Sequence, residues 1–330
     1  MLSIKENLQE TLKKDGHPDR FVKQYEFLHV LLPTTYYMGD YPFVPGTQGY
    51  DQFGVLWTFP EGQMGPFPRH DDEHRVLKDI TKWRELLHKP YIPDDPGYWG
   101  MLNGIAAEGR AAGRYVCALH TQGIFERLHA LMGMEDAMLN FYAEPEEVKA
   151  LIDFLTEIEL AYAKVMVERL GIEAVLNHDD WGGIQSTFLS KEMFDEFLLP
   201  AYKQIYGYYK EHNVLIVHHN DGFSATLVPS MIEMGIDIWQ GVLPVNDLPA
   251  LLDKYEGQIT FMGEIETRVI DLPDWTEEKV AAAVERAINK VGARRSFIPC
   301  LTAGLGISHF PGVYDAVDAQ IDRMSRKLFG

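Results

Sequence analysis

Residues 214–217 (Val-Leu-Ile-Val) constrain the fold of this chain more than any other stretch. Four apolar residues in a row, most of them β-branched, are typical of a strand that is buried on both faces of a parallel sheet. The run ends in the polar segment 218–222 (His-His-Asn-Asp-Gly). Because the carboxyl ends of strands in α/β folds face the crevice where ligands bind, we expect chemistry at this point. The pair His219-x-Asp221 can place two donor side chains on one loop, as a metal ion requires.

Similar apolar segments recur along the chain with predicted helices between them. Six consecutive strand-then-helix units, preceded by two weaker ones, predict a single (β/α)8 TIM barrel over residues 1–330. A doubly wound sheet would produce similar local patterning. The capping box formed by Ser3 and Glu6 predicts a helical extension at the N-terminus. The predicted strands lie near residues 27–32, 53–57, 115–119, 174–176, 214–217, 236–239, 259–262 and 296–298.

The segment 33–68 differs from the rest of the chain because it is dense in Gly, Pro, Tyr and Trp. It is too long for a simple turn, and its composition is not that of a linker. We interpret it as a lid that covers a pocket, with Tyr36 and Trp57 as candidate substrate-binding residues. A packed insertion that only closes the end of the barrel would show the same composition.

Charge and cysteine content exclude several classes of protein. The chain has 49 acidic and 30 basic residues, a formal charge of −19, which would repel nucleic acid and anionic lipid. Only two cysteines, Cys117 and Cys300, occur in 330 residues, which favours a reducing compartment over a disulfide framework. No apolar run approaches the roughly 20 residues of a membrane span, and the start lacks the apolar core of a signal peptide. We expect a cytoplasmic protein.

Polar or reactive residues stand at the end of each later predicted strand. Singly, each has an ordinary explanation as a helix cap, a hydrogen-bonded core residue or an apolar filler. Their occurrence at successive strand ends instead favours a shared site, with His219, Asp221 and Cys300 as candidate ligands of a catalytic zinc ion. No glycine-rich nucleotide loop accompanies them. The strand-end residues are His120, His178, Asp179, Asp180, His218, His219, Asn220, Asp221, Gln240, Glu264, Glu266 and Cys300.

Over nearly its full length, the chain resembles the uroporphyrinogen decarboxylase superfamily, and within it the corrinoid-dependent methyltransferases. The motifs that carry the resemblance are specific in their combination and order rather than one by one. They are Lys5-Glu6-Asn7-Leu8, the segment 51–57 (DQFGVLW), Asp179-Asp180-Trp181-Gly182, Ser190-Lys191-Glu192-Met193-Phe194 with Pro200, His219-Asn220-Asp221-Gly222, Gly263-Glu264 and Pro299-Cys300.

The decarboxylases proper carry an Arg-Gln-Ala-Gly-Arg-Tyr signature, which this chain lacks; the corresponding early region is TTYYMGDYPF, without arginine. In the family, those arginines grip the propionate groups of the porphyrinogen. The acidic composition also disfavours a substrate with eight carboxylates. Porphyrin decarboxylation is therefore not the favoured interpretation.

The family's coenzyme M methyltransferases hold zinc with a His-x-Cys pair and a later Cys. His219 and Cys300 match this pattern, and Asp221 replaces the first cysteine. An oxygen donor leaves zinc more Lewis acidic, which suits polarising an ether oxygen. The resemblance thus implies the methyltransferase of an O-demethylase system, and we expect it to move a methyl group from a small aromatic methyl ether to the cobalt of a separate corrinoid protein. The chain has no Asp-x-His-x-x-Gly motif of the kind that coordinates cobalt, so we expect a partner to carry the corrinoid.

Asp180 and Glu264 are our candidates for proton delivery or for orienting ligands, and Trp181 and Gln240 for further contacts to substrate or metal. Two alternatives remain open from sequence. One is a metal-independent decarboxylase in which Asp180 or another pocket acid protonates a carbanion-like intermediate. The other is a non-catalytic barrel that binds a small molecule and has lost its metal through the change from Cys to Asp.

Overall fold

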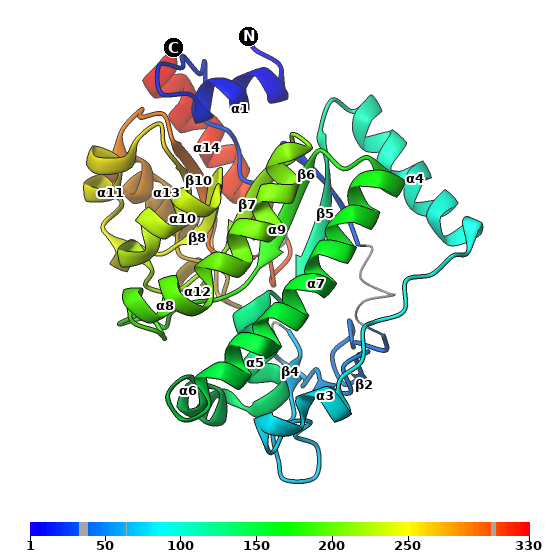
Figure 1. The fold of residues 1–330 in the computed structure, drawn as a ribbon. Helices are drawn as coiled ribbons and strands as arrows, with labels where there is room; N and C mark the ends of the chain where they lie inside the picture. Colours follow the sequence, from blue (N-terminus) through cyan, green and yellow to red (C-terminus); the bar gives the residue numbers. More distant parts are fainter. Residues whose placement is uncertain (33–38, 64, 305–307) are drawn as a thin grey trace.

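A curled, fully parallel sheet of seven strands forms the centre of the molecule and gives it a TIM-barrel-like fold (Figure 1). The computed structural model describes residues 1–32, 39–63, 65–304 and 308–330. The strands are hydrogen-bonded in the order β1-β5-β6-β7-β8-β9-β10, so consecutive strands of the sheet are neighbours in space. Their bounds are β1 Leu28–Leu31, β5 Tyr115–Thr121, β6 Ala174–His178, β7 Leu215–His219, β8 Ile238–Val242, β9 Thr260–Ile265 and β10 Phe297–Leu301.

The sequence predicted eight strands for this barrel, and the described residues contribute seven. Residues 53–57, predicted as an early strand, instead enter a separate antiparallel sheet. Among the described residues, β1 and β10 form no ladder with each other. The Gln24 side chain accepts a hydrogen bond from the backbone N–H of Leu301 (3.2 Å), so the segment before β1 joins β10 through a side chain.

The strands extend further toward their carboxyl ends than predicted. His178, His219, Gln240 and Cys300 lie inside β6, β7, β8 and β10 rather than after them. The ladder hydrogen bonds come from the backbone, so a polar side chain at a strand end does not terminate the strand. This matters for the site because alternation along a strand then decides which way each of these side chains points.

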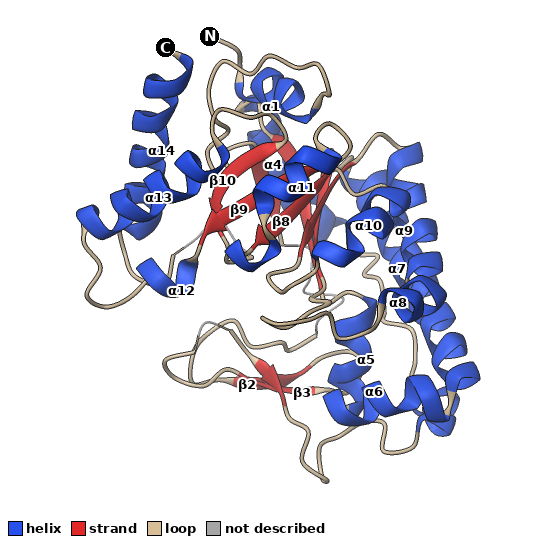
Figure 2. Cartoon of the chain, turned by 90° about the vertical axis from the view of Figure 1, so that its left-hand side faces the viewer, coloured by secondary structure: helices blue, strands red, loops and turns tan. Residues whose placement is uncertain are grey.

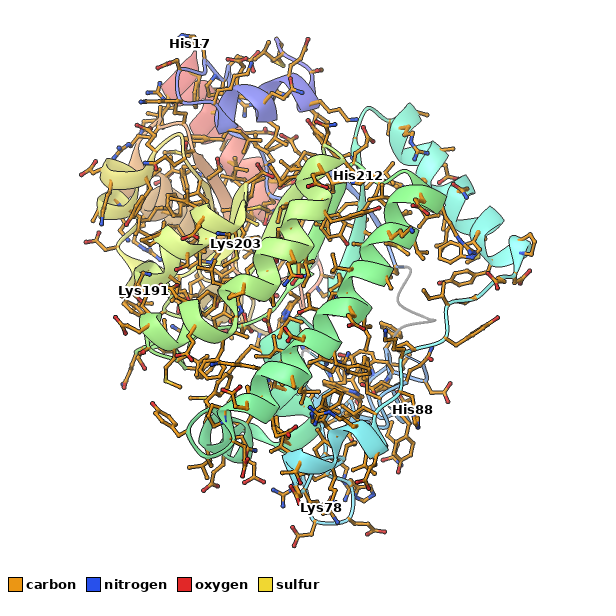
Figure 3. The ribbon with its side chains drawn as sticks, in the orientation of Figure 1. His17, Lys78, His88, Lys191, Lys203 and His212 are labelled. Carbon is orange, nitrogen blue, oxygen red and sulfur yellow. The ribbon has the colours of Figure 1, made fainter. Side chains whose placement is uncertain are left out.

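Helices pack on the outer face of the sheet. α9 illustrates how: it buries Tyr202, Tyr206 and Tyr209 on the sheet side and exposes Lys203 (Figure 3). α8 and α9 are separate helices that meet at Leu198. No helix in the described part of the chain has the length and apolarity needed to cross a bilayer. The helices are α1 Ile4–Leu12, η1 Ile80–Lys82, α3 Trp83–Leu86, α4 Pro96–Ala111, α5 Ile124–Met132, α6 Met134–Ala143, α7 Pro145–Leu170, α8 Lys191–Phe197, α9 Leu199–Glu211, η2 Ala225–Leu227, α10 Val228–Met234, η3 Pro244–Asn246, α11 Leu248–Tyr255, α12 Thr267–Ile270, α13 Glu277–Val291 and α14 Val313–Phe329.

The segment predicted as a lid contributes to a small antiparallel sheet beyond the carboxyl ends of the barrel strands. It consists of β2 (Gln48–Tyr50), β3 (Leu56–Thr58) and β4 (Phe67–Pro68). Figure 2 shows this sheet as a separate layer, next to α5 and α6 and on the opposite side of the barrel from the two termini.

A buried ion pair joins the small sheet to the barrel. The Asp51 carboxylate accepts from the Arg127 guanidinium of α5 at 2.5 Å, and both side chains are 1% exposed. The same carboxylate accepts from the backbone of Phe53 and Val55 and from the indole N–H of Trp57, at 2.9–3.0 Å. Arg127 also lies over the Phe53 ring, 4.1 Å from its centre. The segment is therefore anchored at its base by charge-assisted hydrogen bonds.

Replacing Arg127 tests this anchor. Arg127→Met leaves a buried carboxylate without its cation, so we expect the free energy of unfolding to fall by about 3 kcal/mol or more. Lys89→Met is the control, because Lys89 and Glu157 form an exposed pair (57% and 63%) that is worth at most about 1 kcal/mol. Denaturant unfolding followed by circular dichroism measures both. A loss in the Arg127 variant no larger than in the control would contradict the anchoring role.

Candidate active site

Strand alternation divides the polar strand-end residues into two sets. The barrel interior is filled by every second residue of the strands, for example Leu176, Val217 and Ile238. Two residues further along their strands, His178, His219 and Gln240 continue these inward rows. The residues between them point outward, toward the helices. The outward set is His120, Asn177 and His218.

The outward histidines are held by the helix layer. His218 receives the hydroxyl of Tyr206 at Nδ1 (2.7 Å) and donates from Nε2 to the backbone oxygen of Asp179 (3.1 Å). Its ring stacks on Trp181, with centres 4.0 Å apart. Burial lowers the pKa of His218 to about 3, so the ring is neutral. His120 pairs with Glu159 of α7 in the same layer. These are structural interactions.

The inward set forms the candidate site. One ligand atom each from His178, Asp180 and His219 lies within 4.8 Å of the other two. The two imidazole rings stack with their centres 4.3 Å apart, and Nε2 of His219 is 3.8 Å from Oδ1 of Asp180. β6 and β7 pair in a register that places His178 directly beside His219, so the sheet itself brings the rings together.

Gln240 determines which nitrogen of His219 is available. The Gln240 amide nitrogen donates to the backbone oxygens of Leu301 and Ala303, both at 3.1 Å. Its oxygen therefore faces Nδ1 of His219 and accepts a hydrogen bond from the N–H at that position. Burial and the neighbouring His178 hold the pKa of His219 well below its ordinary value. The ring is neutral, and the lone pair on Nε2 faces the cluster.

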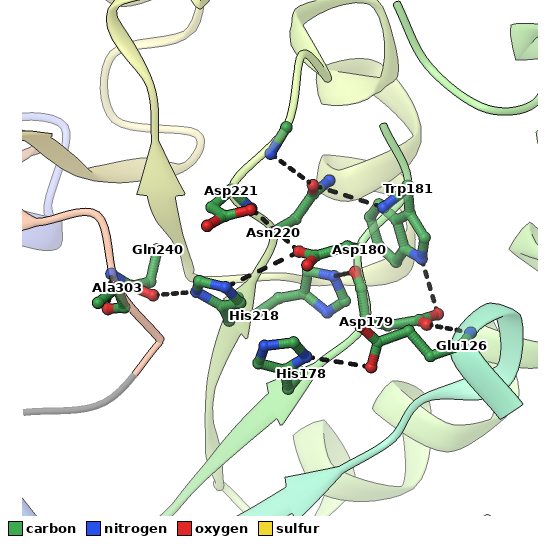
Figure 4. Close-up of polar contacts among 12 residues, drawn as sticks. Glu126, His178, Asp179, Asp180, Trp181, His218, Asn220, Asp221, Gln240 and Ala303 are labelled. Carbon is green, nitrogen blue, oxygen red and sulfur yellow. Dashed lines mark hydrogen bonds and ion pairs between the residues drawn. The ribbon is translucent and has the colours of Figure 1, made fainter. Parts of the chain in front are cut away.

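Glu126 of α5 holds the second histidine. Its Oε2 is 3.1 Å from Nδ1 of His178 (Figure 4). Burial alone would lower the pKa of His178, but the charges of Glu126, Asp180 and Asp221 outweigh burial and raise it to about 10. A positive charge is therefore strongly favoured at this point of the site.

Carboxylates outnumber cations around the cluster. Burial raises the pKa of Asp180 well above its ordinary value; the cationic His178 opposes this, and Glu126 and Asp221 reinforce it. Asp180 also accepts from the backbone N–H of Asp221 at 3.0 Å. A divalent cation between the carboxylate and the two rings would relieve this repulsion, and two His with one carboxylate is a ligand set found in catalytic zinc sites.

The loop after β10 passes close to these ligand atoms. A Cβ on Gly304 would lie 3.1 Å from Nε2 of His219 and 3.1 Å from Cδ2 of His178. Glycine therefore keeps a side chain of its own away from the His219 lone pair. The donor set, the excess of negative charge and the lack of a side chain at Gly304 together fit a bound metal ion.

The structure brings together only part of the ligand set predicted from sequence. His219 is in the cluster. Asp221 is next to it, and its backbone N–H donates to the carboxylate of Asp180. Cys300 is not in the cluster: it is fully buried in the barrel interior with Ile298. Burial, with a contribution from Asp318, raises the pKa of its thiol well above the ordinary value, which disfavours the thiolate that zinc binds.

The two predicted catalytic acids separate. Asp180 belongs to the cluster. Glu264 instead faces α13, where both carboxylate oxygens accept from Lys290 at 2.9 and 3.2 Å. The register between β8 and β9 shifts just before this point, and Glu264 has a φ of 68°, so the simple alternation does not extend to its side chain.

The predicted substrate contacts also have defined positions. Trp57 and Trp181 are buried, and their indole N–H groups donate to Asp51 and Asp179 (3.0 and 2.8 Å). Gln240 orients His219, as described above, and Tyr36 lies outside the described residues. Contact of these side chains with a substrate stays a prediction.

Three residues of the site were not selected from sequence. His178 was one of the strand-end residues but was not chosen as a ligand. Its position two residues after the inward Leu176 was the signal that its side chain also points into the barrel. Glu126 had no signal, because it lies on a helix 52 residues earlier than His178. Gly304 is likewise recognised only from what surrounds it.

Comparison with known proteins identifies the family of the barrel and a structure that shares its fold. The family model of uroporphyrinogen decarboxylase matches residues 112–316, which include β5 to β10. The chain belongs to the uroporphyrinogen decarboxylase family. A uroporphyrinogen decarboxylase from Citrifermentans bemidjiense is 24% identical over 172 residues, 52% of this chain and 46% of that protein. The chain thus matches about half the length of this curated relative.

Among solved structures, a methyltransferase from Methanosarcina mazei superposes with a TM-score of 0.60. The superposition covers 83% of this chain and 76% of that one, at 15% identity. At that identity the likeness establishes a shared fold. The barrel of this chain and that methyltransferase therefore have the same architecture.

Adding a side chain at Gly304 tests whether the cluster binds a metal ion. A Cβ there crowds the His219 lone pair, so we expect Gly304→Ala to weaken Co²⁺ or Zn²⁺ binding at least about tenfold, roughly 1.4 kcal/mol. Gly183→Ala is the control, because a Cβ at that loop glycine meets only Phe188, at 3.8 Å. Isothermal titration calorimetry measures both. Unchanged affinity in the Gly304 variant would show that the metal binds elsewhere.

Proposed function

We propose that this chain is a zinc-dependent methyltransferase that moves a methyl group between a small methylated substrate, an aromatic methyl ether, and the cobalt of a separate corrinoid protein. The observation that carries the proposal is the His219 lone pair, which Gln240 directs into a cluster with His178 and an acid. Membership of the uroporphyrinogen decarboxylase family and the methyltransferase among its structural neighbours support the choice of reaction class.

The proposed ligands are His178, His219 and Asp180, which replace the set with Cys300 expected from sequence. When bound, zinc supplies Lewis-acid stabilisation of the negative charge that develops on the leaving oxygen. Asp221 lies next to Asp180 and its backbone N–H fixes one oxygen of that carboxylate. Because Gly304 has no side chain, it would not block the approach of a substrate to Nε2 of His219.

The chain's own residues have three further tasks in this proposal. Gln240 and Glu126 fix the two imidazole rings through their Nδ1 atoms. The small sheet β2–β4, anchored by Asp51, covers the end of the barrel at which the cluster lies (Figure 2). It would shield the substrate from water, which strengthens electrostatic interactions in the site. The corrinoid protein would approach the same end, because its cobalt must reach the methyl group.

A metal-independent decarboxylase is the alternative that the name of the curated relative suggests. The charges of the site weigh against a porphyrinogen as its substrate. Glu126, Asp180 and Asp221 place three carboxylates at the cluster, and the cations acting on them are His178 and, at Asp221, Arg268. A substrate with eight carboxylates would be repelled there.

Metal analysis of four proteins tests the proposal. We expect about one zinc per chain in the wild type, its loss in His219→Ala and His178→Ala, and its retention in Cys300→Ala. Loss in the Cys300 variant with retention in the His178 variant would restore the ligand set expected from sequence. A wild-type protein that binds no zinc, even after incubation with it, would reject metal-dependent methyl transfer in favour of a decarboxylase or a binding protein.

Activity is measured with an aryl methyl ether and a reduced Co(I) corrinoid protein. We expect the demethylated phenol and methyl-cobalt to form in equal amounts, and chelation of zinc to abolish both. Product formation that survives complete removal of the metal would contradict the assigned chemistry.

A further inference from the structure

Glu126 is a buried carboxylate that contacts the cluster from outside the barrel strands. It lies in the first turn of α5, and its side chain is 12% exposed. Its Oε2 accepts from Nδ1 of His178 at 3.1 Å. Burial raises the pKa of Glu126, but the charge of His178 and its hydrogen bond outweigh burial and lower it. This carboxylate thus contacts the cluster through His178.

Asp179, which follows His178 in the chain, fixes the backbone of Glu126. The Asp179 carboxylate accepts from the N–H groups of Phe125 (3.1 Å) and Glu126 (2.7 Å), at the free N-terminus of α5. Gly123 permits this approach, since a Cβ there would lie 2.5 Å from Asp179. Asp179 holds the helix while the helix holds His178, so the contacts form a closed ring (Figure 4).

The same helix turn is also held by an ion pair to the region of the small sheet. The next residue, Arg127, forms the buried pair with Asp51 of the small sheet. Glu126 therefore has little freedom to move away from His178. A carboxylate held this rigidly can set the orientation of the ring that donates to it.

The two imidazoles of the cluster have different partners. His219 is held by a neutral amide, Gln240, and His178 by a carboxylate. Both partners engage Nδ1, which leaves Nε2 of each ring for the cluster. A carboxylate additionally makes its ring a stronger donor to a cation than an amide does.

We propose that Glu126 is a positioning residue for His178: it holds Nδ1–H so that Nε2 faces Asp180 and His219, and it places a negative charge behind that ring. The consequence for metal binding rests on the proposed function. The orientation of the ring does not, because it follows from contacts made without a metal ion.

Metal titration of two Glu126 variants tests the consequence. Glu126→Gln keeps an acceptor oxygen and removes the charge, whereas Glu126→Ala removes both. We expect Co²⁺ affinity to fall by about 10- to 100-fold in the Ala variant and by less in the Gln variant. We also expect the visible spectrum of bound Co²⁺ to change in the Ala variant, because the ring is no longer fixed.

Glu159→Gln is the matched control. Glu159 is a buried helix carboxylate that pairs with His120 on the outward face of the sheet, 5% exposed. This variant should lose stability yet leave Co²⁺ affinity and spectrum unchanged. Wild-type affinity and spectrum in Glu126→Ala would overturn the proposal.

A second measurement separates this inference from the proposed function. In metal-free protein labelled with ¹⁵N-histidine, Nδ1–H of His178 should give a slowly exchanging, downfield proton signal. We expect the signal to remain in Glu126→Gln and to disappear in Glu126→Ala. If the wild type binds no metal, the proposed function fails while loss of this signal still supports the positioning role. Retention of the signal in the Ala variant would overturn that role, whether or not the protein binds metal.

Discussion

The parallel register between β6 and β7 is the constraint on which the site depends. It places His178 opposite His219, and the strand period of two turns both rings into the barrel. A shift of one residue in β6 would present Asn177 to the interior and send His178 into the helix layer, where His218 and Trp181 already pack.

Helix α5 connects the parts of the molecule that the sheet does not. Asp179 caps the first turn of α5. In the same turn Glu126 contacts His178, and the next residue, Arg127, forms an ion pair with Asp51 beside the small sheet. One turn of helix therefore touches the cluster, the strand end beside it and the layer that covers the barrel. This arrangement makes the base of the covering segment part of the site's framework.

The charge distribution is the physical basis for proposing a cation at the centre of the site. Carboxylates are tolerated in a buried environment when they are paired or when they bind a metal ion. Asp179 meets this condition through hydrogen bonds from Phe125, Glu126 and Trp181. Asp180 accepts from one backbone N–H, and the cationic His178 is offset by the carboxylates of Glu126 and Asp221. The difference between two adjacent aspartates thus separates a structural acid from one suited to ligation.

What the sequence by itself determined was the class of fold and the end of the barrel at which to look. Continuous apolar runs such as 214–217 specify strands buried on both faces, and the polar residues that follow them can only gather at the carboxyl edge. His219 and Asp180 were recognised in this way. The family motifs, whose order survives in the chain, led to the same barrel.

Only the tertiary structure decided which of the strand-end residues meet. Cys300 and His219 both point into the barrel, yet Cys300 packs in the apolar interior with Ile298 and is not among the clustered ligands. Glu264 leaves the pattern because the ladder shifts register before it. Glu126 enters from a helix 52 residues away from its partner. Side-chain direction depends on strand parity, bulges and helix placement together, and no local pattern in the chain contains all three.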